Sequence, residues 1–331
     1  MKVVVFLMKK ILTRVAVVVV VLLALLAALL VRPSVPLARL EPRYLTDDSS
    51  YYTATILSLD DQPLSVQIHY QDYHPAGEEV VVLIHGAFSS SHTFIPWAEQ
   101  LVNEGYRVLL IDQPNFGLSG GFADNVTSYR RTAEVLRDLL DDLSITKIHL
   151  AGNSLGGAVS WYFASEYPSM VQTLTLIDAV YPTTMTRPDL SWLTDRPWLV
   201  SIFSTFSPRF LVKEILQTAY GDPERLTDEL LTRYYELLLK EGTRQAILTS
   251  TSEPEPSPGY LERLQSLTMP VYLMWGALDT WIPIDVSEAF QSTLQLPDNH
   301  LFIYDDLGHV PMEEDPTTTL TDYLTILRSL D

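Results

Sequence analysis

The chain has 331 residues, 47% of them hydrophobic, which is enough to bury the core of one large domain, with or without an insertion. It contains no cysteine, which excludes disulfides, thiolate metal sites and a cysteine nucleophile. The formal net charge is -19, and the sequence shows no cluster of Lys and Arg of the kind that binds phosphate. We therefore expect a folded protein with no nucleic-acid partner.

The amino-terminal segment 1–31 is strongly apolar. Every residue from Val15 to Val31 is Val, Leu or Ala, and a helix of this length rises about 25 Å, close to the ~30 Å hydrocarbon core of a bilayer. The segment ends without a small-residue cleavage pattern, which favours an uncleaved, single-pass signal anchor. Its basic start predicts that the body lies on the non-cytoplasmic side of the membrane. A cleaved signal peptide, leaving a secreted or periplasmic protein, and a buried soluble helix are the alternatives.

The body begins after a Pro-containing linker over 32–50. Two apolar runs, Tyr52–Leu59 and Leu64–Tyr70, flank a turn and predict a hairpin. Short unbroken apolar runs then alternate with amphipathic stretches, which predicts a parallel sheet covered by helices on both faces. The runs expected as strands are Val80–Ile84, Tyr106–Ile111, Lys147–Ala151, Val171–Ile177, Val271–Trp275 and Leu301–Tyr304.

This alternation is interrupted after Asp178. The segment 181–267 is rich in Leu and aromatic residues at helical spacing, and we expect it to form a helical cap between two parts of the core, 51–180 and 268–331. It enters at the carboxyl end of a strand, where open α/β sheets bind ligands, so a lid over a substrate pocket is favoured. A packing subdomain without a role in selectivity is the alternative.

The pattern Gly-x-Ser-x-Gly occurs at Gly152–Gly156, between a predicted strand and a predicted helix. Glycines on both sides permit a sharp turn that exposes the hydroxyl of Ser154 at the edge of the sheet. A serine hydroxyl is a weak nucleophile until a base removes its proton. Ser154 is therefore the candidate nucleophile, and a histidine elsewhere in the chain must serve it.

His309 is the candidate general base, because it follows the last strand in a loop of turn-forming residues where its side chain can face a cleft. Asp279, in the loop after Val271–Trp275, is the candidate acid that orients His309. Asp178, at the end of the neighbouring strand, is a rival acid. Five other histidines lack such a context and are expected to be packing or surface residues: His69, His74, His92, His149 and His300.

A tetrahedral intermediate needs preorganised hydrogen-bond donors for its oxyanion. The backbone N–H of Leu155, directly after the nucleophile, is expected to supply one. The second is expected from the loop that starts at His85 and Gly86, where Ala87 is the favoured donor and Phe88 the next choice.

Together these motifs resemble the α/β-hydrolase superfamily over about residues 51–330. The resemblance rests on His85-Gly86, Gly152–Gly156, Gly276–Asp279 and Gly308-His309-x-Pro311 in that order. It implies a mostly parallel, eight-stranded sheet, no metal or organic cofactor, and substrate contacts from Phe88 and Asn153. The loop that starts at Asp112 is similar to the family's D-x-P-G-x-G-x-S segment, with Asn115 in place of a glycine, and we expect it to be structural.

The resemblance implies hydrolysis of a carboxylic ester through an acyl-enzyme on Ser154. Dehalogenase and epoxide-hydrolase relatives use aspartate at this position, which argues against both. A lipase-like activity on a lipid ester agrees with a membrane anchor. The Gly-Asn-Ser-x-Gly-Gly sequence is also similar to that of hydrolases that cleave carbon–carbon bonds in ring-fission products. A third reading is an α/β-hydrolase homologue that only binds a ligand.

Overall fold

The computed structural model describes residues 2–183, 196–254, 256 and 258–329. Eight strands form one sheet in the order β1-β2-β4-β3-β6-β7-β9-β10. The hairpin of β1 and β2 is antiparallel and pairs antiparallel with β4, whereas the remaining neighbours are parallel. The strands are β1 (Ser49–Leu57), β2 (Pro63–Tyr73), β3 (Val80–Ile84), β4 (Arg107–Ile111), β6 (Ile148–Asn153), β7 (Val171–Ile177), β9 (Val271–Gly276) and β10 (Leu301–Tyr304).

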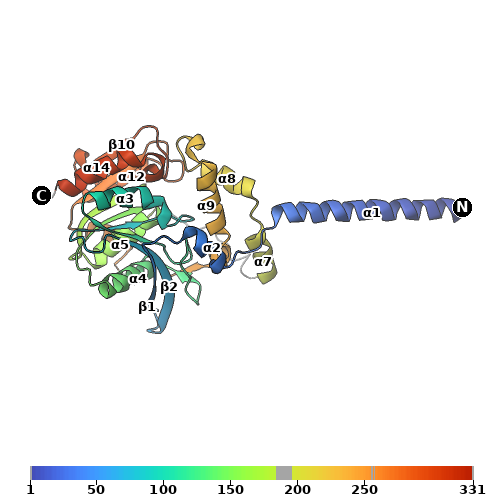
Figure 1. Cartoon of the computed structure of the whole chain (residues 1–331), viewed down its shortest axis with the longest axis horizontal. Helices are drawn as coiled ribbons and strands as arrows, with labels where there is room; N and C mark the ends of the chain where they lie inside the picture. The colour runs from blue at the N-terminus through green and yellow to red at the C-terminus, as the bar shows by residue number, and fades with distance from the viewer. Residues whose placement is uncertain (1, 184–195, 255, 257, 330–331) are drawn as a thin grey trace.

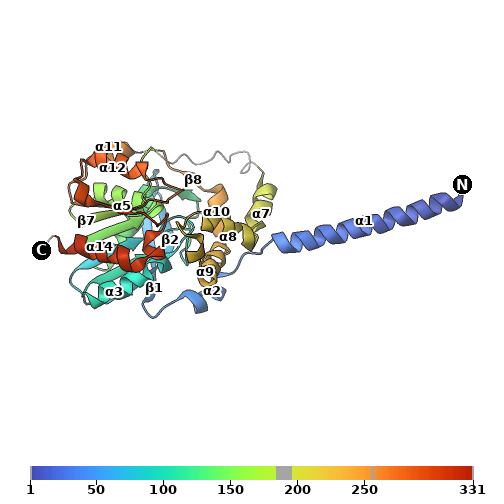
Figure 2. The same ribbon diagram turned by 90° about the horizontal axis from the view of Figure 1, so that it is seen from above.

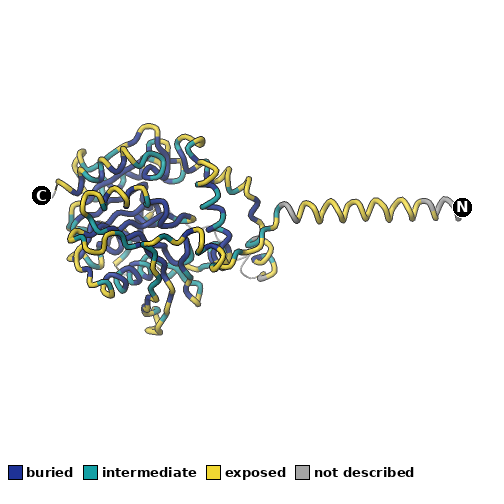
Figure 3. Tube along the Cα trace, viewed as in Figure 1, coloured by how far each residue is buried: buried dark blue, intermediate teal, exposed yellow. Residues whose placement is uncertain are grey.

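Both faces of the sheet are covered, which explains why the central strand β3 is apolar and buried at every position. In β3, Val82 and Ile84 belong to one core cluster, whereas Val81 and Leu83 belong to the other. Figure 3 shows the buried strands at the centre of the body, with exposed residues outside. Helices that contribute to these two cores include α3 (Ile95–Asn103), α4 (Tyr129–Asp142), α5 (Leu155–Glu166), α12 (Asp285–Leu294) and α14 (Pro316–Arg328). The predicted mostly parallel, eight-stranded sheet with helices on both faces is confirmed.

Between β7 and β9 the described chain is mainly helical, as the sequence predicts. A short strand β8 (Thr251–Ser252) in this segment pairs with β5 (Val126–Thr127). Residues 184–195, together with 255 and 257 in the Pro-rich run, belong to the predicted cap but lie outside the described residues. The helices of the segment are α7 (Pro197–Thr205), α8 (Arg209–Gln217), α9 (Asp228–Leu238), α10 (Thr243–Thr249) and α11 (Tyr260–Gln265).

The apolar amino terminus forms one long helix, α1 (Lys2–Leu30), which extends away from the body in Figures 1 and 2. Its stretch Met8–Ala27 is apolar and long enough to cross a membrane, and none of it is buried. A signal sequence has the same properties, so both readings of this segment stay open. The predicted linker contains a helix that the sequence analysis missed, α2 (Leu37–Tyr44), which has Pro42 inside it.

The first turn of α5 packs directly against the backbone of β3. A Cβ atom on Gly156 would lie 2.2 Å from the backbone oxygen of Ile84, and one on Gly152 would lie 2.3 Å from the backbone oxygen of Gly156. Neither clash can be relieved by a side-chain rotation, because each Cβ would collide with a backbone atom. These two glycines therefore fix the distance between the sheet and α5.

Gly156→Ala is expected to lower the free energy of unfolding by about 1–3 kcal/mol, the usual cost of overpacking, because α5 must shift away from β3. Gly120→Ala is the matched control, since a Cβ on Gly120 would lie 3.4 Å from its nearest neighbour, the backbone oxygen of Gln67, which is an ordinary contact. Thermal unfolding of the full chain in detergent measures both. Equal melting temperatures for the two variants would contradict this packing account.

Candidate active site

Ser154 lies on the turn between β6, which ends at Asn153, and α5, which begins at Leu155. Its backbone has φ 55° and ψ -119°, a conformation that L-residues seldom adopt and that stores strain. Two hydrogen bonds hold the turn in place: the N–H of Ser154 donates to the oxygen of Ile177 at 2.9 Å, and the N–H of Val180 donates to the oxygen of Ser154 at 3.1 Å. The predicted sharp strand-to-helix turn is therefore present.

His309 and Asp279 are hydrogen bonded to each other, Nδ1 to Oδ2, at 2.7 Å. The second oxygen of Asp279 accepts from the backbone N–H groups of Trp281 at 2.7 Å and Ile282 at 2.9 Å. A carboxylate held in this way accepts from Nδ1–H, which leaves the electron pair of the imidazole on Nε2. That Nε2 atom is buried and has no hydrogen-bond partner among the described residues.

Because Nε2 has no partner in the part of the chain that the structure describes, His309 is not hydrogen bonded to Ser154. What connects them is Asn153, whose Nδ2 donates to the backbone oxygen of His309 at 2.9 Å and to that of Ile177 at 3.2 Å. Both hydrogens of this amide are thus used on the backbone. Asn153 therefore ties the turn of the nucleophile to the loop of the base, a function that the sequence did not indicate. Its predicted contact with substrate stays a prediction.

The loop that carries His309 is held by the segment between α8 and α9. The N–H of His309 donates to the oxygen of Ala219 at 2.7 Å. Glu314 accepts from the N–H of Gly308 at 2.7 Å and from that of Gly221 at 2.9 Å, so one carboxylate bridges the two loops. The position of the base consequently depends on residues of the predicted cap as well as on the core.

The loop after β3 approaches the nucleophile closely, since a Cβ on Gly86 would lie 3.0 Å from the Cβ of Ser154. His85 shapes this loop: its Nδ1 donates to the oxygen of Gly86 at 2.6 Å, and its Nε2 accepts from the N–H of Gln113 at 3.0 Å. Burial lowers the pKa of His85, in agreement with a neutral ring. Its two ring nitrogens are therefore engaged in shaping the loop.

The two predicted oxyanion donors are the backbone N–H of Leu155, directly after Ser154, and that of Ala87, in the loop after β3. Leu155 is the first residue of α5, where an N–H has no intrahelical partner, and Ala87 follows Gly86; both residues are half-buried. Phe88 is 43% exposed, has a positive φ of 62° and contacts the ring of Phe116 edge-on at 6.2 Å. The roles of Leu155, Ala87 and Phe88 stay predictions.

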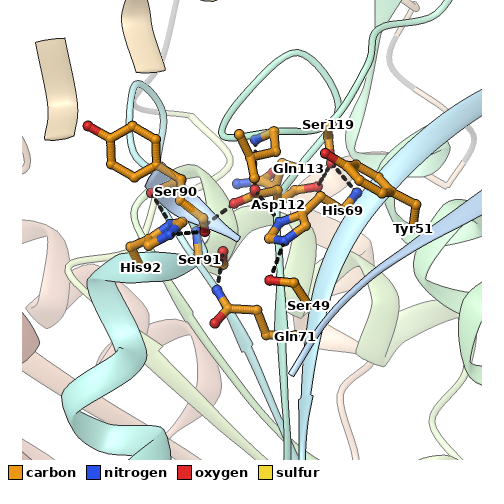
Figure 4. A network of polar contacts seen from close by, with 12 residues as sticks. Ser49, Tyr51, His69, Gln71, Ser90, Ser91, His92, Asp112, Gln113 and Ser119 are labelled. Carbon is orange, nitrogen blue, oxygen red and sulfur yellow. Dashed lines mark hydrogen bonds and ion pairs between the residues drawn. The ribbon is translucent and has the colours of Figure 1, made fainter. Parts of the chain in front are cut away.

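Asp112, which is fully buried, is the centre of a second polar network (Figure 4). It accepts from His69 Nδ1 at 2.7 Å and from the N–H groups of Ser91 at 2.6 Å and Leu118 at 2.8 Å. Burial alone would raise the pKa of Asp112, but the hydrogen bond from His69 and the neighbouring histidines hold it well below its ordinary value. These contacts join the loops that follow β3 and β4, so the structure agrees with the expected structural role of Asp112.

Three further histidines form hydrogen bonds with residues other than Ser154. His92 bonds the oxygen of Tyr44 through Nε2 at 2.8 Å, and His300 bonds the oxygen of Val271 at 2.8 Å. His149 bonds Thr173 at 2.9 Å and Glu79 at 3.0 Å. These contacts agree with the packing roles expected for these three side chains.

Asp178 lies beside the pair of His309 and Asp279 but is not hydrogen bonded to the histidine. Its Oδ1 accepts from the N–H of Gly276 at 3.0 Å, and its buried Oδ2 accepts from no donor among the described residues. Burial and the adjacent charge of Asp279 raise the pKa of Asp178 well above the ordinary value of 3.8. A neutral Asp178 can share its proton with Asp279, whereas two ionised carboxylates so close together would repel each other.

Asp178, Asp279 and His309 also form a group that could hold a metal ion, since one ligand atom from each lies within 4.8 Å of the others. The hydrogen bond between Asp279 and Nδ1 of His309 already uses the ring nitrogen on this side. A raised pKa favours the protonated form of Asp178, which binds a metal ion less well than a carboxylate does. A shared proton therefore accounts for this cluster better than a metal does.

The raised pKa of Asp178 predicts how stability depends on pH. The folded state holds this proton to a higher pH than the unfolded chain, so the stabilisation is complete below about pH 4 and is lost as pH rises through the folded pKa. The Asp178→Asn variant has no carboxyl to ionise at this position, so its free energy of unfolding should fall less as the pH rises through this range. Denaturant unfolding at stepped pH measures the difference, and a difference that does not change with pH would contradict the assignment.

Comparison with known proteins agrees with this geometry. A family model described as alpha/beta hydrolase fold matches residues 79–316. A 2-hydroxy-6-oxononadienedioate/2-hydroxy-6-oxononatrienedioate hydrolase of Paraburkholderia phymatum is 30% identical over 257 residues, covering 74% of this chain and 85% of its own.

Two solved structures share the fold at lower identity. A thermophilic esterase from Thermogutta terrifontis has a TM-score of 0.68 at 23% identity, over 85% of this chain and 98% of its own. A membrane phospholipase A has a TM-score of 0.61 at 21% identity, over 97% of this chain and 98% of its own. The family model, which spans most of the chain, decides the assignment: the protein belongs to the α/β-hydrolase superfamily.

Proposed function

We propose that the protein hydrolyses carboxylic esters through an acyl-enzyme on Ser154. The observation that carries the proposal is the hydrogen bond between Asp279 and Nδ1 of His309, because it leaves the buried Nε2 available as a base for Ser154, which lies on a strained turn. Nucleophile, orienting acid and base then follow one another along the chain in the order Ser154, Asp279, His309. This is the order of the α/β-hydrolases.

In the first half of the reaction, the oxygen of Ser154 attacks the ester carbonyl and His309 Nε2 takes the hydroxyl proton. Asp279 stabilises the imidazolium that forms. The N–H groups of Leu155 and Ala87 donate to the oxyanion, and His309 returns the proton to the leaving alcohol. Water, activated by the same histidine, then releases the acid and restores Ser154.

A lipid ester is the substrate class that we favour. The apolar helix α1 serves as the membrane anchor in this proposal, with the body on the non-cytoplasmic side of the membrane. The likeness to a membrane phospholipase A over 97% of this chain supports an enzyme that works at a bilayer. In this reading segment 181–267 is the cap, 32–50 the linker, and 51–180 with 268–331 the catalytic core.

Hydrolysis of a carbon–carbon bond is the second candidate, because the relative from Paraburkholderia phymatum is named as a hydrolase of dienedioates and trienedioates. Such compounds carry two carboxylates. The chain holds 41 acidic residues against 22 basic ones, and four of the basic residues lie in the first 31 positions. The charge of the body therefore disfavours a dianionic substrate and favours a neutral ester.

The activity test uses p-nitrophenyl esters from acetate to palmitate with the full chain in detergent. Turnover of at least one ester should be lost in Ser154→Ala, since the nucleophile is removed, and an optimum at long chains would agree with a lipid substrate. No turnover across the series, together with cleavage of a 2-hydroxy-6-oxo-dienedioate, would replace the ester proposal with the second candidate.

Asp279→Asn should lower kcat by about 10⁴-fold, the size of effect known when the orienting acid of a serine triad is neutralised, because His309 adopts the wrong tautomer. Asp178→Asn is the matched control from the neighbouring strand end. It should stay within about tenfold of the parent, since burial and the charge of Asp279 raise the pKa of Asp178 and so favour its neutral form in the parent as well. A larger loss in Asp178→Asn than in Asp279→Asn would move the role of the acid to Asp178.

A further inference from the structure

Helices α7 and α8 expose an unusual number of large apolar side chains. Trp198 is 63% exposed and Phe210 is 65% exposed, although aromatic side chains of this size usually contribute to a core. Large apolar side chains exposed on two consecutive helices are a common feature of interaction sites. We call the set the α7–α8 face; its members are Trp198, Ile202, Phe206, Phe210, Leu211 and Ile215.

The α7–α8 face begins where α1 ends. Val31 forms an isolated antiparallel bridge with Phe206, and the N–H of Arg32 donates to the oxygen of Thr205 at 2.7 Å. Figures 1 and 2 both show α7 beside the body end of α1. The apolar surface of α1, none of which is buried over Met8–Ala27, therefore continues onto the α7–α8 face.

The chain after α1 is fastened to the same region and does not act as a free tether. Val35 donates to the oxygen of Leu239 at 2.8 Å and accepts from the N–H of Glu241 at 2.9 Å. Arg244, only 5% exposed, donates to the oxygen of Arg32 at 2.9 Å and to Oγ of Ser34 at 3.1 Å. A bilayer crossed by α1 would consequently lie next to α7 and α8, with no slack to hold them away.

The chemistry of α8 fits the headgroup layer of a membrane. Leu216 is buried in the core, whereas Phe210, Leu211 and Ile215 point outward. Arg209 and Lys213 are exposed on the same helix, with one acid, Glu214, beside them. Helices that lie in the interface combine exposed Trp, Phe and Leu with Lys and Arg that reach the phosphates.

We propose that the α7–α8 face is a membrane-docking surface that rests in the headgroup layer of the bilayer crossed by α1. The inference rests on the membrane anchor of the proposed function and names the surface through which the enzyme meets a lipid ester. The surface is also connected to the candidate site. Directly after α8, the oxygen of Ala219 accepts from the N–H of His309, and Thr218 accepts from the ring N–H of Trp281 at 2.8 Å.

The absence of cysteine allows single labels to test this surface in the full chain. The variants Trp198→Cys and Phe210→Cys would each be labelled with an environment-sensitive fluorophore. Each labelled protein would then be placed in phosphatidylcholine vesicles with and without doxyl-labelled lipid. Ile303→Cys, 47% exposed on β10, is the matched control. We expect doxyl lipid to remove most of the fluorescence at positions 198 and 210 and little of it at position 303.

Equal quenching at all three positions would overturn the proposal. Labels at 198 and 210 that are protected from aqueous iodide yet insensitive to doxyl lipid would overturn it as well, because a second copy of the chain would then cover the face. Neither result depends on catalysis. Failure of the proposed function would appear instead as lost Ser154-dependent turnover in the p-nitrophenyl ester assay.

Discussion

The close backbone packing of β3, β6 and the first turn of α5 is the constraint on which the rest of the site depends. Gly152 and Gly156 allow an approach that no side chain would permit, and Ser154 is held between them at a φ of 55°. The same packing places Leu155 at the start of α5, where an N–H has no intrahelical partner, and sets Gly86 beside Ser154. In the proposed mechanism, the strained turn thus positions both the nucleophile and one donor to its oxyanion.

The candidate base is held by a separate set of contacts, which come from both parts of the chain. Asp279 orients the ring of His309, Asn153 binds its backbone oxygen, and Ala219 binds its N–H. Ala219 directly follows the helix that carries Phe210, so the His309 loop and the α7–α8 face are parts of one connected structure. A membrane that supports α8 would therefore also support the loop of the base.

Much of this arrangement could be predicted from the sequence, because local patterns determine it. The apolar run Val80–Ile84 is confirmed as a strand with the expected bounds, the predicted helix after Ser154 is present, and Asp279 pairs with His309 as expected. Contacts between distant segments leave no local pattern, which is why the bridging role of Asn153 was not foreseen. Helix α2 was missed because Pro42 argues against a helix, and its stability comes instead from packing of Leu40 and Tyr44.

The central claim is that Ser154 is the activated nucleophile, and covalent labelling tests it most directly. The full chain would be treated with a fluorophosphonate, and the adduct located by intact mass and peptide mapping. We predict one adduct, on Ser154, that is absent from Ser154→Ala. A folded protein that takes up no probe, or one that is labelled equally well after Ser154→Ala, would contradict the account.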